Sequence, residues 1–157
     1  GSGKSTLLNI IGGIDDADSG YVSINNEKTK DMKESELTRY RRKHLGYVFQ
    51  MYNLIPNLNV KENIEVGAYL SDSPLDIDEL LNTLLCDEPT GALDYHTSKE
   101  ILKLIEDVNK KYGNTVIMVT HNDAIQNMAD RVIKLRDGEI MDNIVNKDKI
   151  DARNLEW

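Results

Sequence analysis

The run Gly1-Ser2-Gly3-Lys4-Ser5-Thr6 constrains the fold more than any other feature of the sequence, because it is the second half of the pattern G-x-x-x-x-G-K-[ST]. Glycines let backbone N–H groups turn inward around phosphate oxygens, and a helix that begins directly after them adds the positive end of its dipole. In such a loop Lys4 reaches the β- and γ-phosphates and Ser5 places its hydroxyl on Mg²⁺. A short Gly-Lys-Ser run also occurs in flexible tags. The other motifs of the sequence must therefore decide between a phosphate-binding loop and a tag.

Helical and strand patterns alternate along the rest of the chain. Lys4 to Ile11 is predicted to be a helix that ends at Gly12-Gly13. A charged helix over 34–44 leads into an apolar strand over 45–50, and a second apolar strand covers 84–86. A β-branched strand over 115–120 and a hairpin that turns at Asp137-Gly138 complete the pattern. The alternation predicts an α/β fold with a mostly parallel central sheet.

The longest predicted helix runs from Thr97 to Tyr112. Thr97 and Glu100 have the spacing of a capping box, and Gly113 follows the last turn, where glycine is favoured. The apolar stripe predicted for its buried face consists of Ile101, Leu104, Ile105, Val108 and Tyr112.

Composition places the chain among soluble globular proteins. It has 157 residues, about one domain, of which 39% are hydrophobic and 29% charged. Its formal net charge of −8 opposes a protein that binds nucleic acid by neutralising phosphates, so no nucleic-acid partner is expected. The single cysteine excludes an internal disulfide.

Two carboxylates directly follow the predicted strand Leu84-Leu85-Cys86. Asp87, at the end of a buried strand, can hold Mg²⁺ through water. Glu88 can orient or deprotonate an attacking water. A single acidic pair is often only the solvated end of a strand, but the following run Pro89-Thr90-Gly91-Ala92-Leu93-Asp94 makes that alternative much weaker.

Two more polar residues follow predicted strands. His121 can hydrogen-bond a γ-phosphate or the attacking water, although a lone histidine is more often a structural or surface residue. Gln50 ends the run Tyr47-Val48-Phe49-Gln50 and carries no information by itself. The order of the motifs does carry information: phosphate loop, glutamine, Asp-Glu pair, histidine.

In this order the motifs resemble the ATP-binding subunit of ABC transporters, a P-loop NTPase. Residues 1–6 match the end of the family's Walker A motif and 84–87 its Walker B motif. Gln50 matches its Q-loop, Glu88 its catalytic glutamate, 92–94 its D-loop and His121 its switch histidine. Together with Tyr52-Asn53-Leu54-Ile55-Pro56 and Val60-x-Glu62-Asn63-Ile64, the run over 86–94 is similar to the lipoprotein-release and macrolide-export branch, LolD and MacB.

The resemblance covers residues 1–157 as a single ATP-binding domain and implies an ATPase that uses ATP and Mg²⁺. It assigns catalysis to Glu88, His121 and Gln50, and the metal to Ser5, Gln50 and Asp87. The residues it assigns to the nucleotide are Gly1, Ser2, Gly3, Lys4, Ser5, Thr6 and Asp94, the last of which couples two nucleotide sites.

The resemblance also implies partners. Two ATPase subunits pack head to tail as a homodimer with two ATP molecules between them. Residues 50–64 dock a separate integral membrane permease, and this contact places the chain at the cytoplasmic face of the cell membrane. ATP hydrolysis by the chain then powers export or release of a peptide, antibiotic or lipoprotein through the permease. Apolar residues in this region suit an interface, and they would equally suit coverage of the local core. They are Tyr52, Leu54, Ile55 and Leu58.

The sequence departs from the family pattern at three points. The first half of Walker A, the strands that precede it and the Leu-Ser-Gly-Gly-Gln signature do not occur in it. Gln50 and Asp87 are also closer together than the family pattern predicts. We therefore expect segments of a larger ATPase domain to be missing before Gly1 and near 83–85, with the helical subdomain largely absent; a truncated protein is the alternative.

Three other functions remain as alternatives. A regulatory GTPase would need Asn-Lys-x-Asp, but Asn146-Lys147-Asp148-Lys149 has lysine where the aspartate must be. An ABC-type ATPase acting outside transport, in DNA repair or chromosome condensation, would need long heptad arms or a basic surface. The third alternative is a truncated fragment that binds nucleotide without hydrolysing it. Such a fragment would lack the signature motif with which one subunit closes over the ATP of the other.

Overall fold

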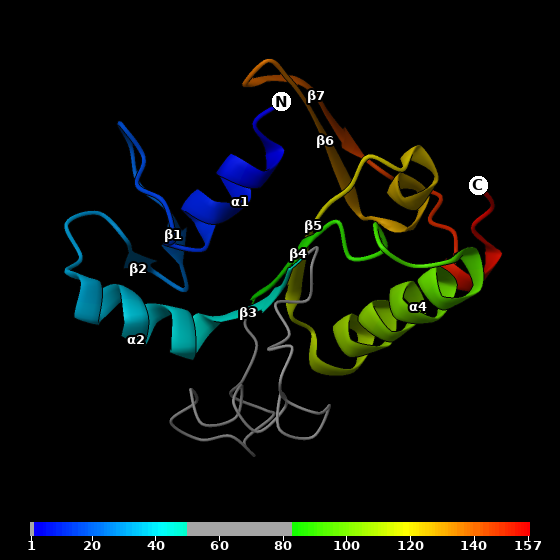
Figure 1. Cartoon of the computed structure of the whole chain (residues 1–157), viewed down its shortest axis with the longest axis horizontal. Coiled ribbons are helices and arrows are strands. Elements are labelled where there is room, and N and C mark those ends of the chain that lie inside the picture. Colours follow the sequence, from blue (N-terminus) through cyan, green and yellow to red (C-terminus); the bar gives the residue numbers. More distant parts are fainter. Residues whose placement is uncertain (1, 50–82) are drawn as a thin grey trace.

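The computed structural model describes residues 2–49 and 83–157, which contain helices and three small sheets (Figure 1). Gly1, Gln50 and the predicted permease-docking region 50–64 lie outside the described residues. In chain order the elements are α1 (Lys4–Ile11), β1 (Ser23–Ile24), β2 (Glu27–Lys28), α2 (Glu34–His44), β3 (Leu45–Val48), β4 (Thr83–Asp87), α4 (Tyr95–Tyr112), β5 (Thr115–Val119), the 3-10 helix η1 (Asp123–Met128), β6 (Arg131–Arg136), β7 (Glu139–Val145) and the 3-10 helix η2 (Ala152–Asn154). Helices α1 and α2 lie on one side of the sheet formed by β3, β4 and β5, and α4 lies on the other (Figure 1).

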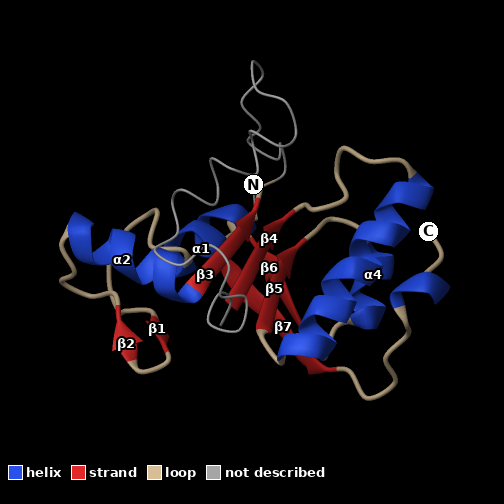
Figure 2. Cartoon of the chain, turned by 90° about the horizontal axis from the view of Figure 1, so that it is seen from below, coloured by secondary structure: helices blue, strands red, loops and turns tan. Residues whose placement is uncertain are grey.

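The central sheet is parallel and has the order β3-β4-β5. Its middle strand, β4, is apolar on both faces because helices cover both sides (Figure 2). Leu84 and Cys86 point to one face and pack with Ile105 of α4. Leu85 points to the other face, toward Gly12 at the end of α1. The predicted α/β fold with a parallel sheet is confirmed.

The stripe predicted for the long helix α4 is confirmed at Ile105, which is buried, and at Ile101, which packs against the same cluster, but it is wrong at Leu104. Leu104, which the sequence pattern places inside, is 58% exposed, whereas Leu102 is completely buried. Leu102 packs with Ile125 of η1 and with Ala152 and Leu155 of the C-terminal segment. The docking of the C-terminal segment therefore widens the buried face of α4 to include Leu102, while Leu104 stays outside it.

The start of α4 also differs from the prediction. The helix begins at Tyr95, and its N-cap is Asp94, whose side chain accepts hydrogen bonds from the backbone N–H of Thr97 at 3.0 Å and from its hydroxyl at 2.7 Å. The capping box predicted at Thr97 and Glu100 is therefore wrong, because Thr97 lies within the first turn. The predicted C-cap is confirmed: Gly113 has the left-handed φ of 65° that glycine adopts without strain.

Strands β6 and β7 form the predicted antiparallel hairpin. Asp137 and Gly138 turn it with φ values of 51° and 82°, the backbone signs of the tight turn that matches strand twist. The tip of this hairpin lies beside the N-terminal end of the chain (Figure 1). The hairpin therefore reaches the loop that precedes α1.

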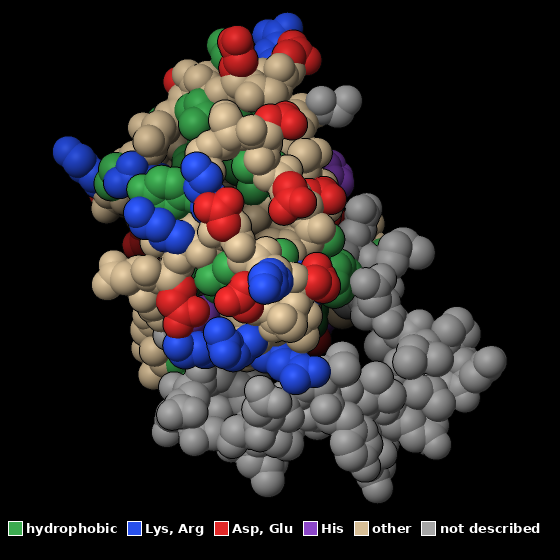
Figure 3. All heavy atoms as spheres, turned by 90° about the vertical axis from the view of Figure 1, so that its left-hand side faces the viewer, with side chains coloured by type: hydrophobic (Ala, Val, Ile, Leu, Met, Phe, Trp, Pro, Cys, Tyr) green, Lys and Arg blue, Asp and Glu red, His purple; other side chains and the backbone are tan. Residues whose placement is uncertain are grey.

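The surface over α2 and the β1–β2 hairpin carries charges of both signs. Figure 3 shows both acidic and basic side chains on this face, with several basic side chains side by side along its lower edge. Within α2, Arg41 pairs with Glu34 at 2.7 Å, and Lys43 pairs with Glu27 of β2. Among the helices that the structure describes, none combines the length and the apolar character that a membrane crossing requires.

Candidate functional site

The loop before α1 has the conformation expected of a phosphate-binding turn. Gly3, the N-cap of α1, has a left-handed φ of 81°, and its carbonyl accepts the backbone N–H of Leu7 at 2.9 Å. The Lys4 ammonium folds back over this loop and donates to Ser2 Oγ at 3.0 Å. No acidic residue lies in the first turn of α1. The positive end of the helix dipole therefore faces the loop, and no acidic side chain of α1 itself offsets it.

Ser5 and Asp87 come together at the end of the central strand. The Ser5 hydroxyl donates to Asp87 Oδ1 at 3.2 Å. This contact exists because Leu8, on the same helix, is buried and α1 packs against β4 and β5. A hydroxyl beside a carboxylate is the pair of hard oxygen donors that Mg²⁺ prefers.

The Ser5–Asp87 pair fits a Mg²⁺ ion whose other ligands are water molecules and substrate phosphates. Among residues 2–49 and 83–157, no group of three or more His, Cys, Asp or Glu side chains is placed to hold a metal. Mg²⁺ is commonly bound through one or two protein oxygens while water and substrate phosphates complete its shell. The two donors present therefore suit a metal that arrives with a phosphate.

Glu88 and His121 form a second pair at the same edge of the sheet. Strands β4 and β5 run in register with Asp87 beside Val119, and the Glu88 N–H donates to the Val119 carbonyl at 2.9 Å. Since an ionised carboxylate only accepts, His121 Nδ1 donates to Glu88 Oε2, at 2.8 Å. The Glu88 side chain is 13% exposed and that of His121 75% exposed. A shielded carboxylate thus lies behind an imidazole that solvent or a ligand can reach.

The backbone of Glu88 is strained. Its φ of 47° lies in the left-handed region, which is unfavourable for a residue with a Cβ. Such strain persists where the surroundings fix the conformation and is common at functional sites. Here it turns the chain sharply after β4 and aims the Glu88 carboxylate at His121.

The remaining predicted site residues are distributed around these two pairs. Thr6 lies exposed on the first turn of α1. Asp94 caps α4, and its hydrogen bonds from Thr97 lower the pKa of its carboxyl group. Gly1 and Gln50 lie outside the described residues. The structure therefore joins Ser5 to Asp87 and Glu88 to His121, while the side chain of Asp94 is turned to its own helix.

Two neighbours of the site have no signal in the sequence. Gly138, at the tip of the β6–β7 hairpin, donates its N–H to the Ser2 carbonyl at 3.4 Å. Tyr47 on β3 donates its hydroxyl to Asn9 Oδ1 on α1 at 3.0 Å. Burial, and then the nearby Asp87 carboxylate, raise the pKa of Tyr47, so its hydroxyl stays a donor. Both contacts depend on tertiary packing.

Comparison with known proteins identifies the family. The family model "ABC transporter" matches residues 1–139. A putative ABC transporter ATP-binding protein of Mycoplasma genitalium is 39% identical over an alignment of 194 positions that covers 100% of this chain and 42% of that protein. The macrolide export ATP-binding/permease protein MacB of Haemophilus ducreyi is 36% identical, over 93% of this chain and 26% of its own length.

Solved structures identify the same family as these relatives. The dimeric ATP-binding cassette MJ0796, in a post-hydrolysis state bound to ADP and Pi, matches with a TM-score of 0.82 and 32% identity, over 92% of this chain and 81% of that chain. The chain spans 42% of the length of the first curated relatives it matches. With its parallel sheet and phosphate loop, the chain belongs to the ABC transporter family, as an ATP-binding component of the branch that includes LolD and MacB.

Proposed function

We propose that this chain binds and hydrolyses ATP to power a transporter that exports or releases its substrate through a membrane permease. The observation that carries the proposal is the placement of two polar pairs, Ser5 with Asp87 and Glu88 with His121, at one edge of the parallel sheet beside the phosphate loop. Catalysis of phosphoryl transfer depends mainly on positioning and on neutralising charge. These pairs supply oxygen donors, a base and a hydrogen-bond donor at one place.

The phosphate loop holds the triphosphate. Ser2 and Gly3 offer backbone N–H groups to it, Thr6 adds a hydroxyl contact, and Gly1 belongs to the same motif. Lys4 swings from Ser2 Oγ, 3.0 Å away, to the β- and γ-phosphates. Ser5 and Asp87, together with Gln50, would hold a Mg²⁺ ion, which would supply positive charge against the phosphates.

Glu88 and His121 carry the hydrolytic step. A water molecule attacks the γ-phosphorus, the bond between that phosphorus and the β–γ bridging oxygen breaks, and ADP leaves. Glu88 takes the proton from the attacking water as general base. His121, which solvent can reach, turns toward the γ-phosphate and donates a hydrogen bond to it, and Glu88 is then free to face the water.

Two partners belong to the proposal. A second copy of the chain packs head to tail across the nucleotides, and Asp94 couples the two sites; the dimeric structures of the related cassette support this. A permease docks at residues 50–64 and places the chain at the cytoplasmic face of the membrane. The names of the relatives MacB, a macrolide export ATP-binding/permease protein, and SyfD, a probable syringafactin export ATP-binding/permease protein, support an association with a permease and an exported cargo. We propose a peptide, an antibiotic or a lipoprotein as that cargo.

A further part of the proposal concerns the length of the domain. The alignment with the Mycoplasma genitalium protein has 194 positions, whereas this chain has 157 residues, so that protein carries positions with no counterpart here. We place the missing positions near 83–85, where the helical subdomain and its signature motif belong. An intact-mass measurement tests this: a mass above 17.8 kDa is expected, and a mass of 17.8 kDa contradicts it.

The substitution Glu88→Gln tests the hydrolytic role. It keeps the shape of the side chain but removes the base, so ATP turnover should fall by about 10²-fold or more while ATP binding remains and an ATP-bound dimer accumulates. Phosphate release and size-exclusion chromatography with Mg-ATP measure the two effects, with and without the permease.

The matched control is Glu100→Gln, which changes an exposed carboxylate on α4 and should retain wild-type turnover. Wild-type turnover in Glu88→Gln contradicts the role of Glu88. ATP binding without turnover in the unsubstituted protein contradicts the ATPase proposal and favours a nucleotide-binding fragment.

A further inference from the structure

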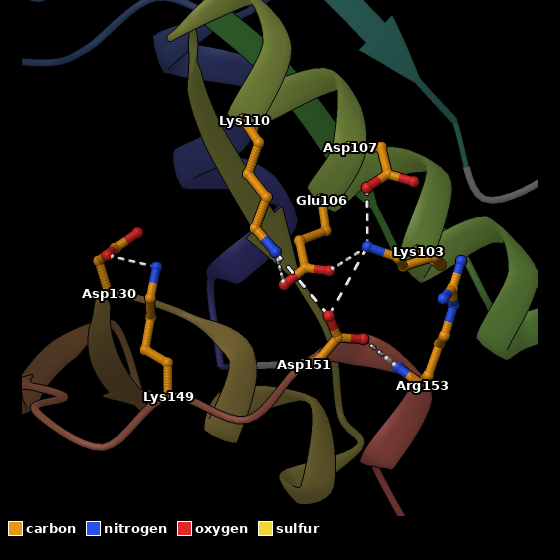
Figure 4. Close-up of polar contacts among 8 residues, drawn as sticks. All are labelled: Lys103, Glu106, Asp107, Lys110, Asp130, Lys149, Asp151 and Arg153. Atoms are coloured by element: carbon orange, nitrogen blue, oxygen red, sulfur yellow. Dashed lines mark hydrogen bonds and ion pairs between the residues drawn. The ribbon is translucent and has the colours of Figure 1, made fainter.

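The C-terminal segment, residues 146–157, follows β7 and folds back along α4. A cluster of ion pairs holds Asp151, in the middle of this segment, against the helix. Figure 4 shows Asp151 facing lysines of α4: its carboxylate lies 3.6 Å from Lys103 and 3.8 Å from Lys110. Glu106 of α4 pairs with the same two lysines at 2.9 and 2.8 Å. Asp151 therefore joins a network of alternating charges that already exists on the helix.

Two buried apolar side chains continue this contact toward the start of α4. Ala152 and Leu155 are 0% and 1% exposed, and both pack in the cluster that contains Leu102 of α4. Full burial of Leu155 and the ion pairs of Asp151 together fix residues 151–155 against the helix. The C-terminal segment is thus a docked part of the fold.

The contact ends at the first residue of α4. The ring of Trp157 lies edge-on to the ring of Tyr95, with centroids 4.9 Å apart and an interplanar angle of 61°, a favourable aromatic geometry. The Tyr95 hydroxyl also donates to the Leu155 carbonyl at 3.4 Å. Tyr95 therefore touches the C-terminal segment with both its ring and its hydroxyl.

Tyr95 directly follows the loop that carries Glu88 at its other end. Within this loop the Gly91 N–H donates to the Glu88 carbonyl at 2.9 Å, and the Leu93 N–H donates to the Thr90 carbonyl at 3.2 Å. Because two successive hydrogen-bonded turns occupy this loop, the connection between Glu88 and α4 is short and constrained. Loop 88–94 therefore joins the buried central strand β4 directly to the first residue of α4.

We infer that Tyr95 and Trp157 form a positioning contact through which the C-terminal segment and the nucleotide site are coupled. The inference rests on the proposed function, since the movement it describes is the response of Glu88 to bound nucleotide. Tyr95 and Trp157 are positioning residues that act through loop 88–94. Nucleotide entry shifts this loop and thereby changes the environment of Trp157.

The chain carries its own reporter for this coupling, because Trp157 is the only tryptophan in the sequence. It is 44% exposed, so a neutral quencher such as acrylamide reaches it and its fluorescence responds to a change of packing. The experiment measures acrylamide quenching of the full chain with and without saturating Mg-ATP. ATP binding is measured separately, by equilibrium dialysis with labelled ATP.

Mg-ATP is expected to change the quenching of Trp157 in the wild-type protein. Tyr95→Ala should abolish this change while ATP binding is retained. Tyr95→Phe keeps the ring pair and should retain the change. Tyr112→Ala, at the other end of α4, is the matched control and should also retain it.

The outcomes separate this inference from the proposed function. ATP binding with unchanged quenching of Trp157 overturns the coupling alone, and so does a nucleotide-induced change that survives Tyr95→Ala. Failure of the wild-type chain to bind Mg-ATP overturns the proposed function and the coupling together.

Discussion

Ser5 and Asp87 are 82 positions apart in the chain, yet their side chains are hydrogen-bonded at 3.2 Å. Each residue alone has an ordinary explanation: Ser5 is a polar residue in the first turn of a helix, and Asp87 is the solvated end of a strand. Their contact favours a shared role, because a hydroxyl and a carboxylate meet at the positive end of a helix and at the end of a buried strand. At the scale of single residues, this pair is the strongest indication of a metal-assisted phosphate site.

Substitution of Ser5 tests the pair. Ser5→Ala removes one oxygen donor for Mg²⁺ and leaves Lys4 in place, so the affinity for Mg-ATP should fall by about tenfold, the effect of losing one hydrogen bond or ligand to a charged group. The affinity for ATP in EDTA should stay unchanged. Equilibrium binding with and without Mg²⁺ measures both values.

Ser19→Ala, in an exposed loop, is the control for this substitution and should leave both affinities unchanged. An equal loss of affinity with and without Mg²⁺ would show that Ser5 acts on the phosphates and not on the metal.

At the scale of elements, the cap of α4 makes stability depend on pH. Hydrogen bonds from Thr97 hold the pKa of Asp94 below its unfolded value. The stabilisation from this cap is therefore complete above the unfolded pKa of about 4 and is lost as the pH falls through the folded pKa. Asp94→Ala should lower the Tm by a few degrees at pH 7 and by less at pH 3.

Asp94→Asn is the matched variant, since its side-chain oxygen still accepts from Thr97 but does not titrate in this range. Its Tm at pH 7 should stay near the wild-type value, and thermal unfolding followed by circular dichroism measures it. Equal losses of Tm for Asp94→Ala at both pH values would contradict the charged cap.

The packing of α4 gives a second prediction at this scale. Leu102 is completely buried between η1 and the C-terminal segment, whereas Leu104 is 58% exposed on the same helix. Leu102→Ala should lower the free energy of unfolding by about 2–5 kcal/mol through lost burial and a residual cavity. Leu104→Ala should change it by about 0.5 kcal/mol or less. Urea unfolding of the two variants compares them, and similar losses would contradict the stripe assigned here.

These elements show which parts of the fold the sequence predicts. Local signals suffice for α1, for Gly113 at the end of α4 and for the Asp137-Gly138 turn, because each depends on backbone preferences of nearby residues. The capping of α4 by Asp94 is also a local contact, with Thr97, that the preference of aspartate for N-caps would have indicated. The choice between Leu102 and Leu104, by contrast, depends on tertiary packing that no local pattern contains. The same holds for the site: its motifs are visible in the sequence, but the contact of Gly138 with Ser2 is not.

At the scale of the whole molecule, the parallel sheet organises the site. Strands β4 and β5 end side by side, and α1 covers one face of the sheet while α4 covers the other. The phosphate loop, the acidic pair and His121 therefore meet at one edge although they lie far apart in the chain. The net charge of −8 does not prevent this, because the local charge that faces a phosphate comes from Lys4 and the end of α1.

The central claim is that this edge of the sheet binds Mg-ATP through the loop before α1. Equilibrium binding of a fluorescent ATP analogue to the wild-type chain and to Lys4→Ala tests it most directly. The account predicts saturable, Mg²⁺-dependent binding to the wild-type chain and an affinity at least about tenfold lower in Lys4→Ala, since a charge-assisted contact to the phosphates is lost. Equal affinities in the two proteins would contradict the account.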